Sequence, residues 1–534
     1  RPNMPLILCE YSHAMGNSNG GLKEYWDIFY SGTNAQGAFV WDWVDQGLRQ
    51  PVPPEYRTTS GRDTFFAYGG WWEDKAGIRN DNNFCMNGLV AADRTVRPGL
   101  LAIKYVYRYL HAAPVDLASG HIKVTNWYDF LNAAEIAEGV WEVKAEGKVV
   151  ASGRFPELDL PPRQAREFRL PLPALRPEPG IEYWLDLRFL TRRDLPWAPR
   201  GHELAWDQFK LPVSAPAPSP DLAAFPPLDM DEQGDEVRFS GKDFVLLFDK
   251  HLAQFSGFTY KGVKLVERGP TPDFWRAMTD NDRGAWKAVG RAWAKDPARN
   301  FMVWRDAGPK WQPREVEVER LDARSARIRI RAHLPEVKST YSLTYTIYGS
   351  GDILVEASYQ PGASPLPMMP RFGMEWVLAP GLEKITWYGR GPAATYWDRN
   401  FERIGVYSST VDAEWVEYSR PQENGNKTEV RWVALTNEKG IGLLAVGMPE
   451  LSVGATHYTK AEIEEADYSF KLRRRPEIYL NLDYRQMGVG GIDSWSPNAL
   501  PLPAYRLPGD QPYSYRYRIT PVEGDFSAKT RLAF

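Results

Sequence analysis

The stretch Leu6-Ile7-Leu8-Cys9-Glu10-Tyr11-Ser12-His13-Ala14-Met15-Gly16-Asn17-Ser18 is the most informative part of this 534-residue sequence. The apolar run from Leu6 to Cys9 ends in an acid, small and polar residues follow, and residues 20–30 then place apolar side chains at helical spacing. This pattern is typical of a parallel strand that delivers a carboxylate to the C-terminal rim of a barrel. Two interpretations of Glu10 stay open here: a catalytic carboxylate, which its polar neighbours orient and keep ionised, and a surface acid at a strand end.

Residues 1–109 predict strand, helix, strand, long loop and helix, with strands at 4–9 and 38–44 and a loop at 46–79. The second strand is almost wholly apolar, as expected of a strand that is buried on both faces. An eight-stranded barrel needs about 250 residues, so this segment predicts only the terminal quarter of a TIM (β/α)8 barrel. The first strand is therefore expected to lack a neighbour and to expose an edge that pairs or aggregates.

The rest of the chain changes to short alternating runs that are typical of β-strands. Residues 110–217, with a tight turn at Glu146-Gly147, predict a small immunoglobulin-like β-sandwich. A Pro-rich linker covers 214–221, and residues 218–534 predict a large two-sheet sandwich. The fold class is accordingly multidomain and mainly β, with three domains at 1–109, 110–217 and 218–534.

Composition excludes several classes of function. The net charge is -3 and no basic block occurs, so nucleic acid is not expected as a partner. No apolar run is long enough to cross a membrane. The two cysteines, Cys9 and Cys85, lie inside motifs and not at scaffold spacings, which indicates a reducing compartment and a cytoplasmic protein. The seven histidines are dispersed and form no zinc motif.

Four motifs, in order along almost the whole chain, resemble the β-galactosidases of glycoside hydrolase family 2. They are residues 8–18, Gly37-Ala-Phe-Val-Trp-Asp-Trp-Val-Asp-Gln46, Asn83-Phe-Cys-Met-Asn-Gly-Leu-Val90 with Ala92-Asp93-Arg94, and Met487-Gly-Val-Gly-Gly-Ile-Asp-Ser-Trp-Ser-Pro497. The resemblance implies a barrel end, an immunoglobulin-like domain and a C-terminal β-supersandwich. It also implies hydrolysis of terminal β-D-galactose from lactose-like glycosides with retention of configuration.

The resemblance assigns roles to individual residues. Glu10 is the implied nucleophile, and Tyr11, Ser12 and His13 stand beside it in the substrate-contacting motif, where the family commonly has Ala in place of Ser12. Trp41 resembles an aromatic wall for the sugar, and barrel core is its alternative. Trp495 resembles a platform for the aglycone, and a buried sandwich residue is its alternative.

Metal ions are implied in the same way. Asn80 resembles a secondary Mg2+ ligand, whereas Phe84, through its carbonyl, and Asn87, through its side chain, resemble Na+ ligands; Asn87 would also touch the sugar. Oxygen donors suit such hard cations. The family's primary Mg2+ ligands correspond to positions upstream of residue 1.

The family's acid/base residue also lies upstream, and no acid of the barrel segment matches its motif; Asp42 and Asp45 are expected to be structural. The chain is thus expected to carry half of an active site and to be almost inactive alone. Its implied partners are the N-terminal part of the same enzyme or a complementary subunit, in an oligomer.

Two alternatives to the enzyme interpretation remain: a carbohydrate-binding or scaffold chain, and a structural subunit that orders a partner's barrel. Residues 274–283 and 420–425 also resemble family segments and are interpreted as structural or gating loops.

Overall fold

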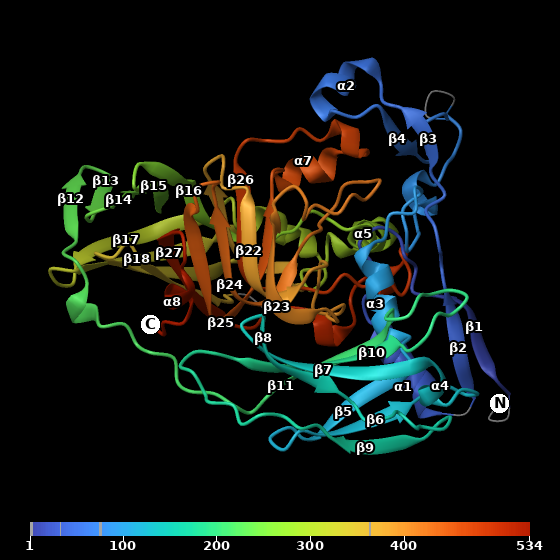
Figure 1. The fold of residues 1–534 in the computed structure, drawn as a ribbon. Helices are drawn as coiled ribbons and strands as arrows, with labels where there is room; N and C mark the ends of the chain where they lie inside the picture. The colour runs from blue at the N-terminus through green and yellow to red at the C-terminus, as the bar shows by residue number, and fades with distance from the viewer. Residues whose placement is uncertain (1–3, 33, 74–76, 363–364) are drawn as a thin grey trace. The chain divides into compact units, whose positions relative to one another are not determined.

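The computed structural model describes residues 4–32, 34–73, 77–362 and 365–534 (Figure 1). The chain divides into two compact units. The first comprises residues 1–102, 221–402 and 407–525, and the second comprises 103–220, 403–406 and 526–534. Each unit has its own core, and each is described by itself.

The barrel segment at the start of the first unit is a two-stranded parallel sheet. Strand β1 (Leu6–Tyr11) pairs with β2 (Ala35–Val40), and helix α1 (Leu22–Ser31) connects them. The expectation that the second strand is buried on both faces is wrong: Phe39 is 67% exposed. The reason is that, within the described residues, β2 pairs with β1 alone, and α1 packs on one side only.

Residues 46–79, expected to form a loop, contain regular structure. An antiparallel pair, β3 (Leu48–Pro51) and β4 (Thr64–Ala67), flanks helix α2 (Pro54–Ser60), and η2 (Asn82–Cys85) follows. Phe65 of β4 packs its ring against Tyr468 and Phe470, at centroid distances of 5.0 and 4.7 Å. This burial, which involves residues four hundred positions away, stabilises a hairpin that local sequence does not predict. Helix α3 (Pro98–Val106) ends the segment.

The second unit contains two antiparallel sheets around a common apolar core. One sheet consists of β5 (Leu110–Asp116), β6 (His121–Asn126) and β9 (Ala165–Arg169), and the other of β7 (Ala137–Ala145), β8 (Lys148–Arg154), β10 (Tyr183–Thr191) and β11 (Glu203–Lys210). The predicted turn at Glu146-Gly147 is confirmed, since both residues have positive φ, as a two-residue hairpin loop requires. Short helices α4 (Ala133–Ile136) and α8 (Ser527–Thr530) belong to this unit.

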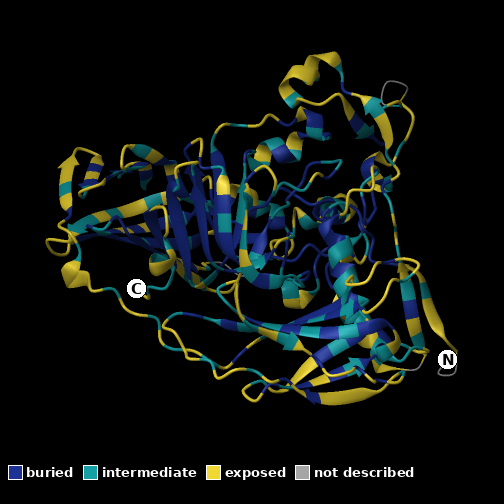
Figure 2. Ribbon diagram, in the orientation of Figure 1, coloured by how far each residue is buried: buried dark blue, intermediate teal, exposed yellow. Residues whose placement is uncertain are grey.

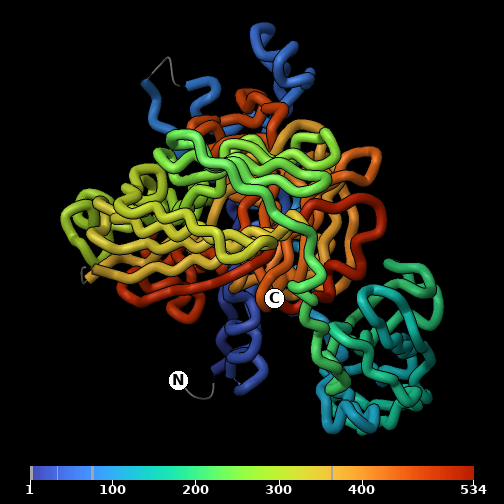
Figure 3. The backbone as a smooth tube through the Cα atoms, turned by 90° about the vertical axis from the view of Figure 1, so that its left-hand side faces the viewer, coloured from blue at the N-terminus to red at the C-terminus, as the bar shows by residue number. Residues whose placement is uncertain are grey.

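The first unit is dominated by one large sheet, which contains sixteen strands among the described residues. Its continuous path is β12 (Asp229–Gln233), β13 (Glu236–Ser240), β14 (Phe244–Asp249), β15 (Gln254–Tyr260), β16 (Val263–Asp273), β21 (Arg371–Leu378), β26 (Ile478–Gln486), β25 (Ile441–Thr456), β27 (Tyr513–Glu523), β20 (Ile353–Gln360), β19 (Ser339–Tyr348), β18 (Ser325–Leu334) and β17 (Gln312–Arg320). Strands β22 (Lys384–Gly391), β23 (Arg403–Thr410) and β24 (Lys427–Thr436) branch from it through β25. Figure 3 shows the strands coloured yellow running side by side.

The core of this unit lies between the curled faces of the large sheet, where the ribbon is mostly dark blue in Figure 2. Strands β18 and β19 show why: their side chains alternate between buried and more exposed positions, so one face of each strand is apolar.

The segments that connect the strands of the large sheet contain few helices. These are α5 (Asp280–Trp293), α6 (Trp304–Ala307), α7 (Lys460–Glu465) and the short η3 (Leu222–Ala224), η4 (Phe301–Val303), η5 (Pro335–Val337), η6 (Ser469–Lys471), η7 (Pro497–Ala499) and η8 (Pro503–Tyr505). None of the helices in the described ranges has both the length and the hydropathy that a membrane span needs.

Candidate active site

Glu10 lies at the C-terminal end of β1, and its side chain is exposed. The next residue, Tyr11, points to the opposite face, as alternation along a strand requires. There its ring packs 5.0 Å from Tyr25 of α1, and its hydroxyl accepts a hydrogen bond of 3.0 Å from Trp26. The strand thus presents the carboxylate of Glu10 on the face that α1 leaves open.

The polar residues after Glu10 were expected to orient its carboxylate, but they bond elsewhere. Ser12 adopts a positive φ of 49°, and its hydroxyl and carbonyl both accept from the amide of Asn19, at 3.0 and 3.2 Å. The Ser18 hydroxyl donates to the His13 carbonyl at 2.6 Å. These short-range bonds reverse the chain directly after the strand and hold the loop 12–19 rigid, without contacting the carboxylate.

The same loop is clamped by segments far along the chain. Asn17 donates its backbone N–H to Gln422 Oε1 at 3.0 Å and its side-chain amide to the Glu423 carbonyl at 2.8 Å. Gln422 in turn donates to Asp280 Oδ2 at 2.7 Å. Gly16 sits against both, with φ of 60°, and a Cβ there would lie only 2.4 Å from Asp280 Oδ2. Only glycine fits this close approach.

Hydrogen bonds assign the tautomer of His13. Its Nδ1 lies 2.8 Å from Ser494 Oγ. Asn281 donates its amide N–H to Ser18 Oγ and to the Val489 carbonyl, so its oxygen must be an acceptor, and Ser494 donates to that oxygen at 2.7 Å. Because the one hydroxyl proton of Ser494 is used there, the His13 Nδ1 must be the donor. The Nε2 atom therefore keeps a lone pair.

Burial also keeps the His13 ring neutral. Desolvation lowers the pKa of His13 to about 4, and the carboxylates of Asp280 and Asp493 oppose this shift only partly. Near neutral pH the ring is uncharged, so Nε2 is a hydrogen-bond acceptor.

Asn87 faces this acceptor. In the amide orientation that satisfies both neighbours, its oxygen accepts from Trp41 Nε1 at 3.1 Å and its nitrogen donates to the Cys85 carbonyl at 3.2 Å. The oxygen end of the amide then lies 3.4 Å from His13 Nε2. Two acceptors side by side complement a donor such as a sugar hydroxyl, or a cation.

Three rings from distant motifs form one aromatic cluster. The His13 ring lies 5.1 Å from Phe84 and 5.2 Å from Trp495, and Phe84 and Trp495 are 5.6 Å apart. Trp495 is 48% exposed and Trp41 44% exposed. Trp495 is therefore not buried within this chain, and the exposure of Trp41 leaves its two interpretations, a wall for the sugar and barrel core, open. Both indoles offer an open apolar face.

The predicted metal ligands differ in how well they fit. Asn87 offers a neutral amide oxygen, a ligand type that suits Na+, and the backbone carbonyl of Phe84 is of the same type. Asn80 instead uses its side-chain oxygen to accept from the Asn82 N–H, 3.0 Å away within its own loop. Among the described residues, the one group of three acid, His or Cys ligands lies elsewhere, beside strands of the large sheet. The residues present fit sodium and do not by themselves make a magnesium site.

Sequence reasoning missed the residues that position the site: Asp280, Asn281, Gln422 and Ser494. A signal existed, since residues 274–283 and 420–425 resemble family segments and are interpreted as structural or gating loops, and Ser494 precedes Trp495 in its motif. Asn281 and Gln422 are completely buried. Buried amides of this kind need partners, and only the tertiary structure identifies these partners as the loop after Glu10.

Comparison with known proteins places the chain in a family. The family model "Beta galactosidase small chain" matches residues 240–519, "Beta-galactosidase, domain 4" matches 122–212, and "Glycosyl hydrolases family 2, TIM barrel domain" matches 1–112. A galactose 1-epimerase structure from Lactobacillus acidophilus covers 56% of this chain and 98% of its own, at 8% identity and a TM-score of 0.34, which is too low to support an argument.

Curated relatives agree with the family models. The chain is 35% identical over 524 residues to the β-galactosidase of Priestia megaterium, which covers 98% of this chain and 48% of that protein. It is 33% identical to the β-galactosidase of Lactobacillus delbrueckii subsp. bulgaricus, over 94% of this chain and 46% of that one. The chain thus spans about half the length of the relatives that it matches. It belongs to the β-galactosidases of glycoside hydrolase family 2.

Proposed function

We propose that this chain supplies the nucleophile half of a retaining β-galactosidase site, with Glu10 as the nucleophile. The observation that carries the proposal is that three distant motifs meet in one aromatic cluster, formed by His13, Phe84 and Trp495. His13 stands three positions after Glu10, whose side chain is exposed. Membership of the family adds support, since the relatives are named as β-galactosidases.

The chemistry proposed for Glu10 is a double displacement. A carboxylate oxygen of Glu10 attacks the anomeric carbon while the bond from that carbon to the glycosidic oxygen breaks. The departing oxygen takes a proton from an acid that the proposal places on the partner polypeptide. Water then attacks the same carbon and gives a proton to the conjugate base of that acid, which releases Glu10 as a carboxylate and yields galactose with its configuration retained.

The other residues bind and orient the sugar. His13 Nε2 and the Asn87 oxygen accept hydrogen bonds from its hydroxyls, and the exposed rings of Trp41 and Trp495 pack on the faces of the sugar and the aglycone. We propose that Asn87 and the carbonyl of Phe84 would hold a sodium ion, whose positive charge would fix a hydroxyl. Tyr11 and Ser12 support the loop from behind, and Asn80 would join a magnesium site only with ligands from outside this chain.

We also propose that another polypeptide, of the kind that completes a barrel, covers the open side of β1. Leu6, Ile7 and Phe39 are more than half exposed on this two-stranded sheet, and β1 has no second neighbour among the described residues. An uncovered apolar strand edge associates readily. Its partner in this proposal is the N-terminal part of the same enzyme or a complementary subunit, within an oligomer.

Covalent trapping tests the role of Glu10. A 2-deoxy-2-fluoro-β-galactoside with an activated leaving group is mixed with this chain, co-expressed with its N-terminal half, and the peptides are analysed by mass spectrometry. We expect the label on Glu10, and we expect Glu10→Gln to remove both the label and turnover of an aryl β-galactoside. The matched control is Glu55→Gln, an exposed glutamate on α2, which should keep both.

Three results would contradict the proposal. The first is a label on another carboxylate, and the second is turnover that survives Glu10→Gln. The third is galactose binding without any turnover by the two halves together, which would favour the carbohydrate-binding or scaffold alternative.

A further inference from the structure

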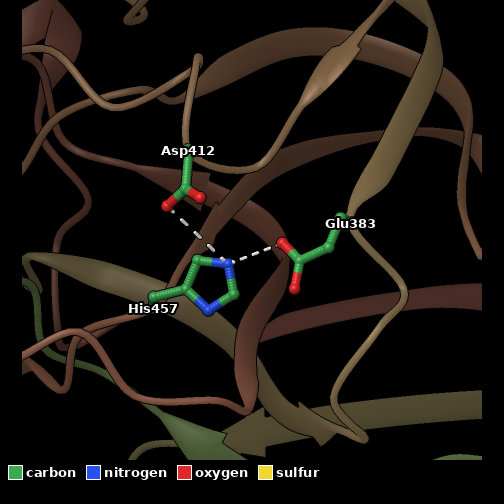
Figure 4. A group of neighbouring side chains, drawn as sticks. All are labelled: Glu383, Asp412 and His457. Atoms are coloured by element: carbon green, nitrogen blue, oxygen red, sulfur yellow. Dashed lines mark hydrogen bonds and ion pairs between the residues drawn. The ribbon is translucent and has the colours of Figure 1, made fainter.

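A second cluster of chemically capable side chains lies at the ends of strands of the large sheet. Figure 4 shows Glu383, Asp412 and His457 pointing toward one another. Glu383 directly precedes β22, Asp412 follows β23 and His457 follows β25. The Val411 N–H donates to the Glu383 carbonyl at 3.0 Å, which holds two of the three backbones together. The three side chains thus come from separate segments of the sequence, and they belong to none of the motifs of the candidate active site.

The orientation of His457 is fixed from behind. Its side chain is 1% exposed, and its Nδ1 lies 3.0 Å from the carbonyl oxygens of both Arg475 and Glu477. Carbonyl oxygens only accept, so Nδ1 carries a proton, and Nε2 carries a lone pair whenever the ring is neutral. A histidine whose far nitrogen donates to a carbonyl in this way is oriented as metal-ligating histidines are.

The Nε2 atom of His457 points at two carboxylates. Glu383 Oε2 is 2.9 Å away and Asp412 Oδ1 is 3.9 Å away, and the ligand atoms of the three residues all lie within 4.8 Å of one another. Acceptor atoms at such distances repel one another unless a positive group lies among them. The cluster therefore requires a cation or a proton.

The Arg474 guanidinium is the cation nearest to the cluster. One of its nitrogens lies 3.0 Å from His457 Nε2, 3.3 Å from Glu383 Oε2 and 3.0 Å from Asp412 Oδ2. The side chain of Arg474 is 43% exposed, and its Nε also donates to both carboxylate oxygens of Asp412, at 3.0 and 3.2 Å, so a metal ion at the cluster would have to displace this guanidinium.

We propose that Glu383, Asp412 and His457 form a binding site for a divalent transition metal of the zinc type, for which Arg474 is the competing internal cation. Zinc binds imidazole nitrogen and carboxylate oxygen at about 2.0–2.2 Å, which places tetrahedral ligands about 3.4 Å apart, close to the separations found here. Two carboxylates and one neutral imidazole match a charge of 2+. With three protein ligands, the ion would tie the segments before β22, after β23 and after β25 together.

Zinc titration by calorimetry tests the site. We expect the unmodified chain to bind one Zn2+ at this site and Arg474→Met to bind it about tenfold more tightly, because the competing cation is gone. Glu383→Gln and His457→Ala should weaken binding about tenfold or more. His457 is buried, so its replacement can impair folding. The side chain of Asp412 is more than half exposed, and Asp412→Asn should weaken Zn2+ binding without that risk. The matched control is His251→Ala, an exposed histidine, which should change nothing.

Co2+ reports the ligand set directly, because its visible absorption depends on coordination. We expect a band in the unmodified chain that disappears in His457→Ala and persists in His251→Ala. Zn2+ affinity that is unchanged in both His457→Ala and Glu383→Gln would overturn the proposal. Binding by Arg474→Met alone, with none by the unmodified chain, would also overturn it, because Arg474 would then be the permanent cation of the cluster.

Discussion

His13 and Ser494 are 481 positions apart in the sequence, and yet Nδ1 of the histidine lies 2.8 Å from Oγ of the serine. Through this bond and that from Ser494 to Asn281, two residues far along the chain decide which nitrogen of His13 carries the proton. A residue of the barrel motif thus has its chemistry set by the other end of the chain. The hydrogen bond between Ser494 and His13 makes Ser494 part of the candidate site, and its contribution can be tested.

Removal of the Ser494 hydroxyl should release the His13 ring. In the assembled enzyme we expect Ser494→Ala to lower kcat/KM for an aryl β-galactoside about tenfold, because a buried hydrogen bond contributes about 1–1.5 kcal/mol. Ser494→Thr keeps the hydroxyl and should restore most of the loss. Equal activities of the Ala and Thr variants would show that the hydroxyl does not position the ring.

His13 should make stability depend on pH. Its pKa is lowered from 6.5 in the unfolded chain to about 4 in the folded protein. The unfolded state therefore binds the proton first, so the contribution of neutral His13 is complete above pH 6.5 and is lost as the pH falls toward 4. Over that range the loss amounts to about 3 kcal/mol.

Urea unfolding of His13→Gln and of the unmodified chain between pH 4 and 7.5 measures this contribution. The difference between the two unfolding free energies should shrink as the pH falls, whereas His251→Gln, at an exposed histidine, should leave the curve unchanged. Parallel curves for His13→Gln and the unmodified chain would contradict the assigned shift.

The ion pair of Asp45 and Arg97 should be structural. Both side chains are at most 5% exposed, and Asp45 also accepts from the Gly88 N–H at 2.7 Å. Asp45→Asn leaves the Arg97 charge buried without a counter-ion, which should cost about 3–5 kcal/mol of unfolding free energy. The control is Asp27→Asn, which breaks the exposed pair with Lys23 and should change stability by about 0.5 kcal/mol or less. Similar losses of unfolding free energy in Asp45→Asn and Asp27→Asn would show that the buried ion pair is not structural in this sense.

Gly16→Ala should disrupt the loop after Glu10 by contact and not by backbone strain alone. The new Cβ would meet Asp280 and Gln422 at about 2.4 Å, at a φ of 60°. Gly61→Ala is a matched control, because Gly61 has a φ of 63° and open space around it. We expect a loss of about 1 kcal/mol for Gly61→Ala and at least about 2 kcal/mol more for Gly16→Ala, measured by urea midpoints. Equal losses of unfolding free energy in the two variants would show that the loop after Glu10 can move to accommodate the added Cβ.

Prediction from sequence succeeded where the signal was local. The turn at Glu146-Gly147 was predicted correctly because both positions need positive φ, and the strand before Glu10 was predicted because its residues are uniformly apolar. It failed for the exposed Phe39 and for the hairpin at Phe65, since burial there depends on what else is packed nearby. The apolar character of a residue favours its burial, but it does not indicate whether another element of the structure packs against that residue.

The sequence by itself determined the carboxylate at the end of β1, the aromatic and amide residues of the motifs, and the family that these motifs indicate. Only the tertiary structure decided that Tyr11 turns away from Glu10, that Asn281 and Ser494 set the tautomer of His13, and that His457 meets two carboxylates. Strand and turn propensities act over a few residues, and they can be read from the chain. Hydrogen bonds between residues hundreds of positions apart exist only after the large sheet has formed, because its register determines which side chains become neighbours.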